Sequence, residues 1–76
     1  MTDAGLAVLD VRDLPAPEPF EQILLALARL EPGQGFVALT PRVPRLLLPR
    51  LEQRGFDFTV REEADGTAAV TIRRPA

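Results

Sequence analysis

Two short segments near the C-terminus of the 76-residue chain alternate apolar and polar residues. The first is FDFTVR, from Phe56 to Arg61, and the second is AAVTIR, from Ala68 to Arg73. This period of two predicts strands with one buried and one solvated face. Between them lies Ala64-Asp65-Gly66-Thr67, a turn sequence typical of a β-hairpin. The side chains expected to point at a helical layer are Phe56, Phe58, Val60, Val70 and Ile72. Those expected on the open face are Asp57, Thr59, Arg61, Thr71 and Arg73.

The first half of the chain predicts a strand, a helix and a second strand. The strands are the apolar runs at residues 6–11 and 36–40. Between them, residues 18–30 carry apolar side chains at helical spacing. Pro17 and Pro19 suit the first helical turn, where no N–H is needed, and Pro32-Gly33 should end the helix. A unit of this size implies parallel strands joined by a right-handed crossover.

Residues 41–55 predict a second helix that starts late. Pro44, Leu47, Leu48 and Leu51 fall on one face. Pro49 conflicts with a regular helix from residue 41, because proline lacks an N–H and clashes with the preceding turn. We therefore expect the regular part over 46–54, followed by Gly55 as the terminating residue.

The element order β-α-β-α-β-β predicts an α+β fold. We expect a two-layer α/β sandwich in which a four-stranded mixed sheet carries both helices on one face. Residues 1–76 should form one domain, ordered over about 6–74.

Composition limits the chemistry that the chain can perform. It has no cysteine and no histidine, which removes thiolate chemistry, the commonest general base and the commonest metal ligands. We expect no cofactor and no metal. A net charge of −2 argues against nucleic acid as the main partner. No apolar run approaches the ~18 residues of a membrane span, and the first residues do not form a signal peptide, so we expect a cytoplasmic protein without membrane contact.

The segment before the first helix resembles the motif of the TusA-like (SirA-like) sulfur carriers. In that family an Asp ends the first strand, and Gly-Leu-x-Cys-Pro-x-Pro then leads into the helix. Here Asp10 is followed by DLPAPEP, residues 13–19. Three residues match the motif: Leu14, Pro17 and Pro19. Glu18 stands at the variable position, Asp13 replaces the glycine, and Ala16 replaces the carrier cysteine. The resemblance covers about residues 7–74 and implies the same fold.

A branch of uncharacterised bacterial domains resembles the chain more closely. It carries LDxR, then Leu-Pro-x-Pro-Glu-Pro, and later Arg/Gln-Gly-Phe before the third strand. The corresponding segments here are LDVR at residues 9–12, LPAPEP at 14–19 and QRGF at 53–56. The branch has the fold and lacks the thiol.

Ala16 determines what the resemblance can mean. In the sulfur carriers the motif holds a cysteine at a helix N-terminus, where the helix dipole stabilises a thiolate or persulfide. Ala16 offers neither a nucleophile nor an acid, so this chain cannot relay a persulfide and we do not expect an enzyme. The remaining feature is a rigid loop beside exposed charges. We predict an interaction loop consisting of Arg12, Asp13, Pro15, Pro17, Glu18 and Pro19.

Other residues admit more than one interpretation. Glu18 and Glu21 could form a carboxylate pair for acid–base chemistry or a hard cation, or could compensate the helix dipole. Asp10 could be a ligand, could cap the first helix, or could pair with Arg12. Leu25 and Leu46 lie off the apolar helix faces, and two exposed leucines near arginines can mark a contact surface. The candidate contact surface consists of Arg42, Arg45, Leu46 and Arg50. Its three arginines could instead bind an anion or RNA, or could simply be solvated.

Three functions are compatible with the sequence. The first is a non-catalytic interaction or regulatory module with an unknown protein partner. The second is an accessory of a sulfur or metal-cofactor pathway that docks as a sulfur carrier does. The third is RNA binding, which rests only on likeness to the C-terminal fold of a bacterial translation initiation factor. We expect a monomer or a weak homodimer.

Overall fold

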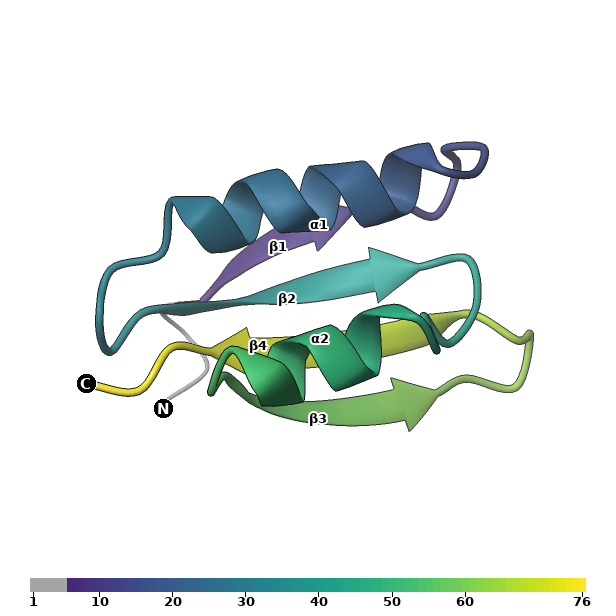
Figure 1. Cartoon of the computed structure of the whole chain (residues 1–76). Coiled ribbons are helices and arrows are strands. Elements are labelled where there is room, and N and C mark those ends of the chain that lie inside the picture. The colour runs from purple at the N-terminus through teal and green to yellow at the C-terminus, as the bar shows by residue number, and fades with distance from the viewer. Residues whose placement is uncertain (1–5) are drawn as a thin grey trace.

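Six elements follow one another in the computed structural model, which describes residues 6–76. They are β1 (Ala7–Asp10), α1 (Glu18–Ala28), β2 (Gly35–Thr40), α2 (Leu47–Gln53), β3 (Asp57–Glu62) and β4 (Ala68–Arg73). The four strands form one sheet in the order β1-β2-β4-β3. β1 and β2 are parallel, whereas β4 is antiparallel to both β2 and β3. Both helices lie on one side of this mixed sheet (Figure 1), which confirms the predicted fold.

The core lies between the sheet and the helices. Alternate residues of the two central strands are buried, with Phe36 and Ala38 in β2 facing inward beside Val70 and Ile72 in β4. The helices cover them with the apolar faces that the sequence predicts: Ile23, Leu27, Leu47 and Leu51. Burial of this apolar surface is the main favourable term in folding a domain this small.

The bounds of α2 confirm the predicted late start. The helix begins at Leu47, so Pro49 occupies its third position, where the backbone N–H would have no partner within the helix. At the other end, Gly55 has a φ of 78°. The Gly55 N–H bonds to the Glu52 carbonyl, and the Phe56 N–H bonds to the Leu51 carbonyl. This pair of bonds is a Schellman motif, which glycine accommodates without a Cβ clash.

The predicted environment of β3 needs correction. Phe58 and Val60 pair with Ile72 and Val70, so they lie on the helix side of the sheet as expected. However, Phe58 is only half-buried and Val60 is 37% exposed. The reason is that β3 is an edge strand and α2 is only seven residues long, so the helical layer does not cover the margin of the sheet.

Candidate functional site

The loop between β1 and α1 is anchored at its start and exposed in its middle. The N–H of buried Val11 donates to the Leu39 carbonyl at 2.9 Å, which extends the β1–β2 pairing by one residue. Leu14 is half-buried against the core. Residues 15–18 then emerge into solvent before α1 begins, and the peptide bond between Ala16 and Pro17 is cis. The structure therefore presents Ala16, which the sequence motif predicts to stand at the carrier-cysteine position, on an exposed loop with a fixed base.

An ion pair between Asp10 and Arg12 holds the start of this loop. Arg12 Nε donates to Asp10 Oδ1 at 2.9 Å, and Arg12 Nη2 donates to Asp10 Oδ2 at 2.8 Å. The Arg12 backbone N–H also donates to Oδ1 at 3.1 Å. These hydrogen bonds lower the pKa of the Asp10 carboxyl to about 2. The structure thus decides between the earlier alternatives: Asp10 pairs with Arg12, and the N-cap position of α1 is taken by Pro17.

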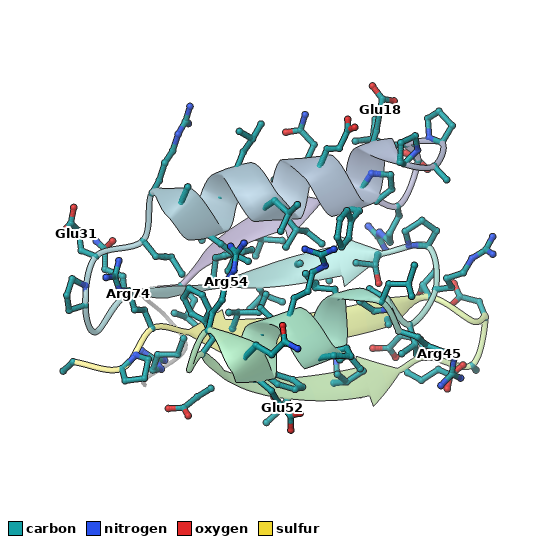
Figure 2. All side chains as sticks on the ribbon, viewed as in Figure 1. Glu18, Glu31, Arg45, Glu52, Arg54 and Arg74 are labelled. Carbon is teal, nitrogen blue, oxygen red and sulfur yellow. The ribbon has the colours of Figure 1, made fainter. Side chains whose placement is uncertain are left out.

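The two acidic residues of the first turn of α1 favour the dipole interpretation. Glu18 and Glu21 are exposed, and Pro19 stands in the same turn. The side chain of Glu18 points away from the body of the molecule (Figure 2). Within residues 6–76, no three acidic side chains gather closely enough to hold a metal ion. Both carboxylates lie next to the positive end of the helix, where negative charge is stabilising.

The second candidate surface lies at the same end of the molecule as the loop. Because β1 and β2 are parallel, their C-terminal ends lie at the same end of the sheet. The segments that follow them, residues 11–17 and 41–46, therefore emerge side by side there. The turn between β3 and β4 is also there (Figure 1). Segment 41–46 is fastened by Thr40, whose hydroxyl donates to the Arg42 carbonyl at 2.6 Å. Leu46, in this segment, is 82% exposed.

A contact between the helices joins the two candidate surfaces. The guanidinium carbon of Arg50 in α2 lies 5.5 Å from the ring centre of Phe20 in α1, a distance typical of a cation–π interaction. Phe20 directly follows Pro19 of the loop motif. The sequence predicted Arg50 on a contact surface, and it gave no signal that this side chain meets Phe20. Arg50 therefore lies next to the predicted loop.

Charge is divided unevenly over this loop end. On the α1 side, the exposed charges beyond the Asp10–Arg12 pair are acidic: Asp13, Glu18 and Glu21. On the α2 side, Arg42 and Arg45 are exposed. Figure 2 shows Glu18 in the upper part and Arg45 in the lower part of the same end of the molecule. The turn between β3 and β4 at the same end adds exposed Glu63 and Asp65. A partner that covers this end would therefore meet acidic side chains from two segments together with Arg42 and Arg45.

Two open hollows lie at the end of the molecule opposite the loop. The larger, of about 620 Å³, is bordered by Arg29 and Arg73, and the smaller, of about 440 Å³, by Arg54 and Arg74. Arg74 Nη1 donates to the Leu30 carbonyl at 2.6 Å, so its guanidinium helps to close the C-terminal end of α1. The sequence predicted none of these four arginines to belong to a functional site. Figure 2 shows Arg54 and Arg74 at the opposite end from Glu18, so the hollows are separate from the loop end.

Comparison with known proteins is consistent with this geometry. A crystal structure of a SirA-like protein from Desulfitobacterium hafniense matches with a TM-score of 0.74 and 26% identity, covering 93% of this chain and all of that one. No curated protein gives a significant match. None of the helices in residues 6–76 is long and apolar enough to cross a membrane. A family model described as an uncharacterized conserved protein, DUF2249, matches residues 8–74. Because that match spans most of the chain, the protein belongs to the DUF2249 family and has a SirA-like fold.

Proposed function

We propose that the protein is a non-catalytic interaction module of the bacterial cytoplasm that contacts a partner protein through its loop end. The observation that carries the proposal is an exposed, firmly anchored loop that bears Ala16, the residue that replaces the reactive cysteine in the motif resemblance to sulfur carriers. Ala16 has no atom that can hold sulfur, attack a substrate or transfer a proton. We also assign the chain to the Cys-less branch that carries the LDxR and LPxPEP motifs.

The anchoring of the loop supports recognition rather than chemistry. The Asp10–Arg12 pair, buried Val11 and half-buried Leu14 hold one side, and prolines restrict the backbone that follows. A loop held in its bound shape pays little ordering entropy when a partner docks. The charged side chains of the loop end would then help to orient that partner, since complementary charges give specificity and speed association.

Site-specific crosslinking tests this proposal directly. A photoreactive amino acid replaces Ala16 in one protein and Arg54, at the far end, in a matched control. We expect the photoreactive residue at position 16 to crosslink one discrete partner protein, identified by mass spectrometry. The residue at position 54 should crosslink different proteins or none. The captured partner, purified, should then bind less tightly to the Pro15→Ala/Pro17→Ala and Glu18→Arg variants than to wild type. Equal crosslinking from both positions would contradict the proposal.

A second candidate function is that of an accessory in a sulfur or metal-cofactor pathway, docking where a sulfur carrier docks. The similarity to a SirA-like structure over the whole fold favours it. Its test is an Ala16→Cys variant incubated with a cysteine desulfurase and labelled cysteine. If carrier docking is retained, the variant should gain one sulfur by intact mass and wild type should gain none. A variant that forms no persulfide would leave only the general interaction module.

A further inference from the structure

The strand β3 forms one margin of the sheet and is open along its outer side. It is six residues long and pairs only with β4 among the strands of residues 6–76. Figure 1 shows β3 at the lower margin, with α2 in front of the sheet and not beside it. An edge strand of this kind can pair with another strand through its free backbone groups.

The hydrogen-bond pattern identifies which residues of β3 are free to pair. Glu63 lies opposite Thr67 and donates its N–H to the Thr67 carbonyl at 2.8 Å. Bonded and non-bonded pairs alternate along an antiparallel ladder. The register of β3 with β4 therefore directs the backbone groups of Asp57, Thr59 and Arg61 toward β4. Those of Phe58, Val60 and Glu62 point outward.

We propose that β3 pairs antiparallel with β3 of a second copy of this chain, with Thr59 at the two-fold axis. In this register Phe58 lies opposite the second copy's Val60, and both have outward backbone groups, so two bonded pairs form. Asp57 lies opposite the second copy's Arg61, which creates two cross-strand ion pairs on the open face of the sheet. The half-buried Phe58 and exposed Val60 gain cover from each other on the helix side.

Charge complementarity selects this register over its neighbours. The two strands can pair only if residues with outward backbone groups lie opposite each other. The two-fold axis must therefore pass through a residue, and neighbouring registers shift that axis by one residue. With the axis at Val60, Asp57 would face Glu63 of the second copy. With the axis at Arg61, two guanidinium groups would face each other. With the axis at Phe58, Asp57 would face Thr59 and no ion pair would form. Of the four registers with the axis at residues 58 to 61, only the one centred on Thr59 makes the strand complementary to itself in charge.

The resulting dimer would have one eight-stranded sheet with four helices on one face. Its interface would be smaller than that of a stable complex, so we expect a dimer that dissociates in the micromolar range. Antiparallel pairing would place the two loop ends at opposite ends of the dimer. This inference does not depend on what the loop end binds.

Analytical ultracentrifugation of the full chain tests the proposal. The mass of wild type should rise with concentration, from the low micromolar to the millimolar range, toward twice the 8.3 kDa of one chain. Asp57→Arg and Arg61→Asp should each raise the dissociation constant by about tenfold or more, since like charges then face each other twice. An equimolar mixture of the two variants should dimerise again, because each strand then complements the other. The double variant, Asp57→Arg with Arg61→Asp, should dimerise as wild type does.

Circular dichroism establishes that each variant is folded before its mass is measured. This matters because Asp57 also faces Arg73 within its own sheet, and Arg61 forms a 2.9 Å ion pair with Glu63. If one single variant fails to fold, the double variant still tests the register. A wild type that stays at the monomer mass throughout the range would overturn the proposal. Single variants that dimerise as strongly as wild type would overturn it too.

Discussion

Leu51 and Leu46 lie five residues apart, yet the structure predicts opposite consequences for removing their side chains. Leu51 is fully buried on the inner face of α2, whereas Leu46 is 82% exposed just before the helix begins. Leu51→Ala deletes buried methyl groups and leaves a cavity, so it should lower the free energy of unfolding by about 3–4 kcal/mol. Leu46→Ala, a matched change of the same side chain, should alter it by no more than about 0.5 kcal/mol.

The loss at Leu51 is large relative to what a chain of this size can have. At about 0.05–0.15 kcal/mol per residue, a domain of this length has a total stability of only about 4–11 kcal/mol. Each kcal/mol shifts the melting temperature of so small a domain by about 4–8 °C. Leu51→Ala should therefore lower Tm by about 12–30 °C, while Leu46→Ala should stay within about 4 °C of wild type.

Thermal unfolding followed by circular dichroism gives both values. Equal Tm values for the two variants would show that α2 is rotated about its axis relative to the face argued above. A large loss at Leu46 alone would mean that the Leu46 side chain packs inward and is not available to a partner. With the expected result, Leu46→Arg becomes a clean probe of partner binding, because the change would not disturb folding.

The structure also predicts the effects of changes at four other positions. Phe58→Ala should cost about 2 kcal/mol in urea unfolding, roughly half the usual value for a buried Phe because Phe58 is half-buried, and Thr59→Ala on the open face should cost little. The lowered pKa of Asp10, about 2 against an ordinary 3.8, means that its pair stabilises the fold fully above about pH 4 and is lost as pH falls through about 2. Asp10→Asn should flatten that part of the stability–pH curve. Gly55→Ala should lower stability by about 1–2 kcal/mol, because φ there is 78°. Wild type, with Ala16, should gain no sulfur from a desulfurase by intact mass.

Sequence periodicity was enough to predict the order of the elements, because strands and helices each left a clear apolar pattern. The alternation of residues 68–73 corresponds to the bounds of β4, and Pro49 correctly indicated a late start for α2. The predicted burial of Val60 was wrong because alternation reports which face a residue occupies, not whether its strand is central or at an edge. Strand order depends on pairing between distant segments, and nothing in the local pattern of β3 encodes it.

The candidate site was predictable in its parts but not in its assembly. The loop motif and the arginines of residues 42–50 were each recognised from the sequence. Their shared location follows from the parallel pairing of β1 and β2, which the crossover rule already implied. The contact between Phe20 and Arg50 had no such signal, since it depends on how α1 and α2 pack side by side. The position of Arg50 beside the loop is therefore a finding of the structure.

The anchoring of the loop and the self-complementary edge of β3 have a joint consequence for binding. A sulfur carrier delivers its sulfur atom to one enzyme at a time. One loop on a monomer is sufficient for this. A module that only binds does not transfer a chemical group, but its affinity increases if two of its binding sites are occupied at once. A dimer paired through β3 would direct its two loop ends away from each other, so they could engage two separate copies of a partner. If the partner is itself multimeric, linked binding would exceed the affinity of one loop by about 10²–10⁴-fold. Asp57→Arg, which leaves the loop intact, would remove that gain and leave the affinity of a single loop end.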